Sequence, residues 1–207
     1  MGGKVRSNFG STDTQKQENI SMAEKTSIRY SRLALIIHWL TAIIVLIAFI
    51  YGPGGSEERI YSTARDFDRQ LHETLGLCVL ALAVLRVLWR AFGTRPAPPP
   101  VARWMEVAAK FVQVSLYILL FAVPLTAVTG AWLEGHSLTL LGGIGVPSML
   151  AKRHAVGAVI ADIHTWLGDA IIWIAGVHAA AGLFHHYVLK DNVLRSMLPR
   201  WLVGVQP

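Results

Sequence analysis

The stretch IHTWLGDAIIWIAGVHAAAGLFHHYVLK, residues Ile163–Lys190, decides the fold because it combines a long apolar run with regularly spaced histidines. His164 and His178 are fourteen residues apart, which is four turns at the 3.5-residue period of a left-handed helical bundle. The two imidazoles therefore share one helix face and lie about 21 Å apart along its axis. An ionisable side chain inside an apolar helix is costly and usually functional.

Three further apolar runs precede this one, and breakers such as GPGGSEE, GTRPAPPP and GGIGVP separate the four. Each run is long enough, at about 1.5 Å per residue, to cross roughly 30 Å of hydrocarbon. The pattern predicts an all-α fold, an integral membrane four-helix bundle. The expected spans are Leu33–Tyr51, roughly Leu71–Phe92, roughly Val107–Leu133 and roughly Ala158–Leu189.

The composition agrees with a membrane protein. Of the 207 residues, 53% are hydrophobic and 15% are charged, against roughly 25% charged in a soluble domain. The length leaves no room for a separate soluble catalytic domain. The net charge of +6 is better explained by basic loops held on the cytoplasmic side than by nucleic acid. The single cysteine, Cys78, belongs to no CxxCH motif, which argues against covalent haem and iron–sulfur clusters.

The distribution of basic residues predicts the orientation. Of the 19 Lys and Arg residues, 14 lie in the N-terminal segment, around the loop after the second span and at the C-terminus. The positive-inside rule therefore places both termini in the cytoplasm. Residues 1–28 are polar and predict a disordered cytoplasmic tail, with either Met1 or Met22 as the true start. Residues 29–200 are the expected membrane domain, and 201–207 form a C-terminal tail.

Two further histidines complete a pattern of pairs. His38 lies near the cytoplasmic start of the first span, level with His178, and His72 begins the second span, level with His164. Each pair joins two different helices, as a bis-histidine haem requires. The sequence therefore predicts two low-spin b-type haems, one above the other, with these four histidines as iron ligands. For any one histidine alone, a hydrogen bond between helices is the competing explanation.

Other residues lie on the same helix faces as the histidines. Gly76 and Gly168 each follow a histidine by one turn, which leaves space for a flat macrocycle or simply lets helices pack closely. Arg86 lies fourteen residues after His72, at the cytoplasmic level, where it is expected to bind haem propionates or, alternatively, lipid phosphate. His136 and His154 are expected to be ordinary surface residues on the outer side.

The sequence resembles the bacterial cytochrome b561 family from about Tyr30 to Arg200. The motifs that carry the resemblance are YSRLALIIHWL, RQLHETLGL with the downstream RVLWR, IHTWLGD, and GVHAAAGLFHHYVLKDNVLRSMLPR. The resemblance implies a di-haem fold in the bacterial inner membrane, the same four haem ligands, electron entry from the periplasm, and reduction of ubiquinone on the cytoplasmic side. It also supports a role for His185 in binding a propionate or giving a proton to the quinone, beside the alternative of a simple interfacial histidine.

The expected activity is that of an oxidoreductase that takes electrons from a periplasmic donor, superoxide first among the candidates, and oxidises it to O2. Lys152 and Arg153 are expected to attract such an anion, helped by Arg59, Arg65 and Arg69 and opposed by nearby acids. Membrane lipid and ubiquinone are the other partners, and no nucleic acid or obligate protein partner is expected. An alternative is a quinone-linked carrier subunit for a partner dehydrogenase. A divalent-metal transporter is disfavoured because its ligands would cluster at one depth.

Overall fold

The computed structural model describes residues 31–92, 101–191 and 193–198. Within these ranges, four helices are long and apolar enough to cross a membrane, which confirms the predicted all-α membrane bundle. They are α2 (Arg32–Ile50), α4 (Asp66–Phe92), α5 (Arg103–Glu134) and α6 (His154–Phe184). The predicted tails 1–28 and 201–207, and both possible starts, lie outside the described residues.

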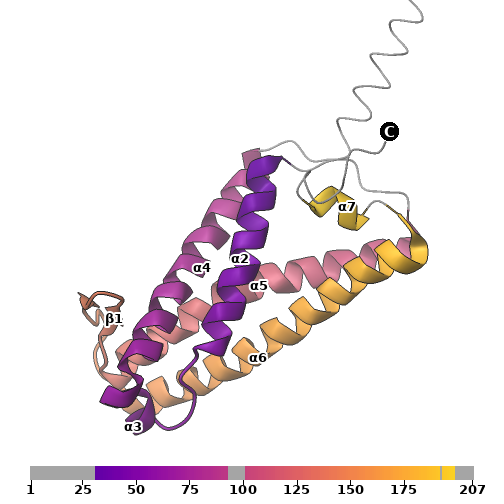
Figure 1. Cartoon of the computed structure of the whole chain (residues 1–207). Coiled ribbons are helices and arrows are strands. Elements are labelled where there is room, and N and C mark those ends of the chain that lie inside the picture. The colour runs from indigo at the N-terminus through magenta and orange to yellow at the C-terminus, as the bar shows by residue number, and fades with distance from the viewer. Residues whose placement is uncertain (1–30, 93–100, 192, 199–207) are drawn as a thin grey trace, which may run out of the picture.

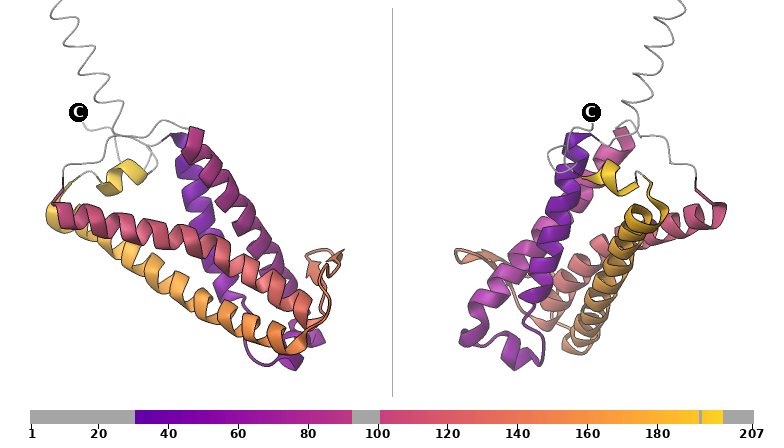
Figure 2. Two further views of the ribbon diagram at one scale, coloured as in Figure 1. Left: turned by 180° about the vertical axis from the view of Figure 1, so that it is seen from behind. Right: turned by 45° about the vertical axis from the view of Figure 1, so that its right-hand side comes forward.

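The four helices alternate in direction and form two antiparallel pairs, α2 with α4 and α5 with α6, joined by contacts between α4 and α5. The pairs lie close together at one end and diverge towards the other (Figures 1 and 2). We call the first end the hairpin end, formed by residues 51–65 and 135–153. The opposite end, which carries the short helix α7 (Val193–Met197), is the α7 end.

Local chemistry sets where the helices begin and end. Ser31 caps α2, because its Oγ accepts a hydrogen bond from the Ala34 N–H at 3.2 Å. Gly135 ends α5 in the left-handed conformation at φ 94°, where a side chain would be strained. Pro124 lies inside α5, where it removes one backbone hydrogen bond of the helix. The turn after α2 follows from Gly52 and Pro53.

The bundle buries few side chains and exposes many apolar ones. The core cluster lies where α4, α5 and α6 meet and consists of Val79, Ala83, Leu119, Leu120 and Ile171. Large apolar side chains on the outer faces remain exposed, among them Ile50 at 66%, Phe111 at 72%, and Trp166 and Trp173 at 77% each. Such a surface is stable in contact with lipid tails rather than water.

The hairpin end contains structure that the sequence did not reveal. Strands β1 (Leu138–Leu140) and β2 (Ile144–Val146) form an antiparallel hairpin, with Gly142 and Gly143 at positive φ in the turn. Two backbone N–H groups fix this hairpin on α4, since Thr139 N donates to Glu73 Oε2 at 2.6 Å and Leu141 N donates to Thr74 Oγ1 at 2.9 Å. The connection after α2 adds the short helices α3 (Glu57–Ile60) and η1 (Thr63–Arg65).

Helices α5 and α6 approach closely near the hairpin end. A Cβ on Gly157 would lie 2.6 Å from the backbone N of Glu134, so only glycine fits there. At the α7 end, α6 continues into the π-helical turn η2 (His185–Leu189), and Lys190 then adopts a left-handed φ of 54°. Trp39 Nε1 donates to Met197 O at 2.8 Å, which ties α7 to α2.

Candidate functional site

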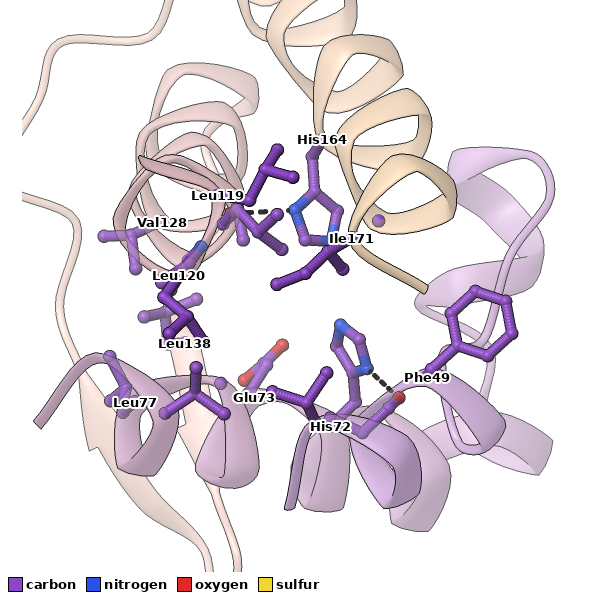
Figure 3. Close-up of a pocket in the computed structure, with 18 residues that line it drawn as sticks. Phe49, His72, Glu73, Leu77, Leu119, Leu120, Val128, Leu138, His164 and Ile171 are labelled. Atoms are coloured by element: carbon purple, nitrogen blue, oxygen red, sulfur yellow. Dashed lines mark hydrogen bonds between the residues drawn. The ribbon is translucent and has the colours of Figure 1, made fainter. Parts of the chain in front are cut away.

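His72 of α4 and His164 of α6 face each other across an apolar pocket in the half of the bundle nearer the hairpin end (Figure 3). Their ring centres lie 5.9 Å apart. Two imidazoles that bind one metal ion from opposite sides, through bonds of about 2 Å, hold their ring centres roughly 6.4 Å apart. The pair therefore has the spacing of axial ligands on either side of one metal.

Both of these imidazoles have a fixed tautomer. His72 Nδ1 lies 2.7 Å from the Ala48 carbonyl oxygen, and His164 Nδ1 lies 2.9 Å from the Val123 carbonyl oxygen. Because a carbonyl only accepts, each Nδ1 carries the proton and donates it. Each Nε2 therefore keeps its lone pair for a metal, which is the usual arrangement of a metal-binding histidine with its outer partner.

The pocket has room for a flat apolar group. Its wall is apolar except for the two histidines and Glu73. A Cβ added to Gly76 or Gly168 would meet no atom within 4 Å, so both glycines border open space next to the imidazoles. Leu138 of the β-hairpin closes the pocket at the hairpin end (Figure 3). The donor set and the space together fit a haem.

A second pair of histidines lies nearer the α7 end. The ring centres of His38 in α2 and His178 in α6 are 6.3 Å apart. Here the partner differs, since Arg86 Nη2 donates to His38 Nδ1 at 2.9 Å. A guanidinium has no acceptor, so this contact puts the His38 proton on Nε2. Arg86 must therefore leave Nδ1 before His38 can bind a metal through Nε2.

Arg86 has a further contact at this level. Its guanidinium carbon lies 5.6 Å from the ring centre of Tyr117 in α5, at the distance of a cation–π contact. Arg86 therefore lies beside the His38–His178 pair and the Tyr117 ring, and its role there stays a prediction.

His185, also singled out in the sequence, is paired with an acid that sequence reasoning missed. Its Nδ1 donates to Asp191 Oδ2 at 2.5 Å across the π-helical turn. Burial alone would raise the pKa of Asp191, but the hydrogen bonds from His185 and from the Val193 N–H lower it below the usual value. The Asp191 carboxylate therefore stays ionised down to acidic pH. It is protonated, and stops acting as the charged partner of His185, only when the pH falls below that lowered pKa.

The basic residues at the hairpin end divide into paired and unpaired groups. Arg65 pairs with Asp68 at 2.8 Å, and Arg69 pairs with Asp66 at 2.8 Å and with Glu73 at 3.2 Å. Among the described residues, Lys152 and Arg153 form no ion pair within 4 Å and are exposed. Arg65 and Arg69 are thus poor attractors for an anion, whereas Lys152 and Arg153 remain available.

Comparison with known proteins defines the class. Residues 29–200 match the family model of the prokaryotic cytochrome b561, whose members are helical membrane proteins that bind b-type haem. The chain belongs to the prokaryotic cytochrome b561 family and is therefore a membrane electron-transfer cytochrome.

Individual relatives extend this result. The chain is 30% identical over 174 residues to cytochrome b561 homolog 2 of Escherichia coli, which covers 84% of this chain and 93% of the relative. Cytochrome b561 homolog 1 of the same organism is 32% identical over 83% of this chain and 98% of its own length. A protein of Yersinia pestis described as probable superoxide oxidase CybB is 29% identical over 83% of this chain and 97% of its own.

The open space at Gly168 can be tested directly. We expect Gly168→Leu to lower the b-haem content per chain, because an added side chain occupies the pocket beside His164 and overpacking costs about 1–3 kcal/mol. The measurement is the pyridine haemochrome of the purified protein. Ala180→Leu, at an exposed position of the same helix, is the matched control and should retain its haem. Full haem content in Gly168→Leu would show that this space holds no haem.

Proposed function

We propose that this protein is a di-haem cytochrome that oxidises superoxide at the periplasmic face and reduces ubiquinone at the cytoplasmic face. In balance, two superoxide anions give up one electron each as two O2, and the quinone takes up two electrons and two protons. The observation that carries the proposal is the presence of two histidine pairs with ring centres 5.9 and 6.3 Å apart at two levels of one membrane bundle.

The residues that would hold the two groups are His72 with His164, and His38 with His178. A haem held by two histidines would supply a carrier of single electrons, so its chemistry would be electron transfer. The chain contributes the ligands, the apolar walls and the outer hydrogen bonds that set ligand basicity. Two levels are needed because electrons must travel between opposite faces of the membrane.

Arg86 is the residue proposed to receive haem propionates near the α7 end. Its guanidinium donates to His38 Nδ1 and lies over the Tyr117 ring, and it forms no salt bridge with an acid of the described residues. A carboxylate would give it a bidentate partner and release the Nδ1 atom of His38. Binding of a propionate by Arg86 would therefore leave His38 in the tautomer with the proton on Nδ1, which is the tautomer that binds a metal through Nε2.

The orientation is proposed from the distribution of basic residues, with the hairpin end in the periplasm and the α7 end in the cytoplasm. Superoxide is an anion, and Lys152 and Arg153 lie at the start of α6, at the same end as the His72–His164 pair. Their positive charge would raise the rate of encounter. A relative described as a probable superoxide oxidase supports the choice of donor.

The number of haems per chain tests the proposal that each histidine pair binds one haem. We expect about two b-haems per chain by pyridine haemochrome, matched by two irons, because each histidine pair would bind one. His178→Ala should lose the haem at the α7 end and keep the other, since His72 and His164 lie on the opposite level. His186→Ala is the control, because His186 belongs to neither pair. A single iron per wild-type chain would refute the di-haem proposal.

The donor is tested with the purified protein. Generated superoxide should reduce the bound haem and added ubiquinone without another protein, which separates this proposal from a carrier subunit for a dehydrogenase. The double variant Lys152→Gln with Arg153→Gln should lower the second-order rate several-fold at low ionic strength. The difference should shrink in high salt, because surface charge is screened within about 8–10 Å.

The matched control for this charge change is Arg103→Gln with Lys110→Gln, which removes the same charge near the opposite end of the bundle. It should leave the rate unchanged. Equal rates for the wild type and the Lys152/Arg153 variant at low salt would show that these two residues do not attract superoxide. Failure of superoxide to reduce the haem would favour the carrier-subunit alternative.

His185 and Asp191 are proposed to supply protons to the quinone at the α7 end. The carboxylate holds Nδ1–H of His185, so Nε2 is the atom that can give a proton to a quinone oxygen. Asp191 acts as a positioning residue, because it orients the imidazole without touching the quinone. The π-helical turn brings the two residues together, as such turns often do at functional sites.

Asp191→Asn should slow ubiquinone reduction roughly 10- to 100-fold, because the outer partner of a working imidazole is lost. The rate at which superoxide reduces the haem should not change, because Asp191 lies at the other end of the bundle. The two rates are measured separately by stopped-flow spectroscopy. Glu106→Gln, an exposed acid near the start of α5, is the control. Equal slowing of both rates would indicate a general structural defect instead.

A further inference from the structure

A cluster of acids and histidines lies at the hairpin end, outside both histidine pairs. Glu57 comes from α3, Glu134 from the last residue of α5 and His154 from the first residue of α6. One ligand atom from each lies within 4.8 Å of the others. In Figure 1 the short helix α3 lies beside the point where α5 ends and α6 begins. Three connections that are distant in sequence therefore meet here.

We propose that Glu57, Glu134 and His154 bind one divalent cation of the zinc class. Two carboxylates and one neutral imidazole carry a charge of about −2, which a divalent ion neutralises. An imidazole ligand favours zinc and its neighbours over magnesium and calcium, which prefer an all-oxygen shell. Three protein ligands leave a fourth position of a tetrahedral ion for water or a small anion.

Glu134 is the strongest reason for a cation. The residue is only 9% exposed, and its carboxylate accepts no hydrogen bond from the part of the chain that the structure describes. A carboxylate with so little access to water, placed within 4.8 Å of the ligand atoms of Glu57 and His154, would be stabilised by a cation between them. The backbone holds it there, because Gly157 lets α6 pass directly against Glu134 and Arg153 N donates to Leu133 O at 2.8 Å.

The remaining two ligands are already close to one another. Glu57 Oε2 lies 3.8 Å from His154 Nε2, so a small side-chain movement admits an ion between them. Glu57 Oε1 accepts a hydrogen bond from His136 Nε2 at 2.6 Å. This bond makes His136 an outer partner that orients the Glu57 carboxylate, as is common around metal sites.

The cluster is connected to the region of His72. Tyr61 stacks on His136 with ring centres 3.6 Å apart, and Arg69 lies 5.3 Å from the Tyr61 ring centre. Arg69 in turn pairs with Glu73, which lines the pocket beside His72. A bound ion would therefore fix the connection after α2 against both helix pairs near the mouth of this pocket.

The test uses the purified full-length protein, with any affinity tag removed and after treatment with EDTA. Isothermal titration with ZnCl2 should give about one ion per chain at micromolar or tighter affinity, and Mg2+ at the same concentration should not bind. Glu134→Gln and His154→Ala should each weaken Zn2+ binding at least about tenfold. Glu58→Gln, an exposed acid next to Glu57 that lies outside the cluster, should bind as the wild type does.

Two further measurements keep the outcome clear. The haem spectrum of each variant reports whether the bundle has folded, independently of superoxide or quinone activity. Zinc-edge X-ray absorption of the wild type should show one imidazole and oxygen ligands, and needs no variant. No Zn2+ binding, a sulfur ligand, or equal affinity in wild type and Glu134→Gln would overturn the proposal. None of these outcomes bears on the proposed electron transfer.

Discussion

Imidazoles placed between the helices of an apolar bundle impose the main constraint on this molecule. Inside a membrane each polar ring atom must have a partner, because no water is present to satisfy it. His72 and His164 meet this requirement with one nitrogen through the backbone carbonyls of Ala48 and Val123. Within the part of the chain that the structure describes, the other nitrogen of each ring has no hydrogen-bond partner, and both rings line the pocket. The end of α2 and the course of α5 are therefore as important to the site as the histidines themselves.

Space is the second requirement, and the bundle provides it through its glycines. Gly157 allows close packing of α5 on α6 near the hairpin end, whereas Gly76 and Gly168 border open space within the pocket. The same residue type thus has two opposite functions in one fold. The helix pairs lie close together at the hairpin end and diverge towards the α7 end.

Much of this arrangement followed from the sequence. Hydropathy alone located the four long helices, and the depth of each histidine along its helix matched the two pairs that lie together in the structure. The fourteen-residue spacing was informative because helix geometry is regular and a membrane fixes the level of each helix. The role of these pairs as haem ligands stays a prediction.

Features that depend on contacts between loops were not accessible in this way. The β-hairpin has only three residues in each strand, and its position depends on Glu73 and Thr74 of another helix. His136 and His154, expected to be ordinary surface residues, lie with Glu57, although 79 residues separate Glu57 from His136. Asp191 was missed because a regular α-helix would not place it against His185. A signal was present in the single acid that follows HHYVLK.

The two histidine pairs differ in the charged side chain beside them. Near the hairpin end the pocket wall includes Glu73, whose carboxylate is paired with Arg69 at 3.2 Å. Near the α7 end the guanidinium of Arg86 donates to His38 Nδ1 and forms no salt bridge with an acid of the described residues. A group bound between His38 and His178 would therefore meet a positive charge that the described chain does not balance, whereas the acid beside His72 already has its counter-ion.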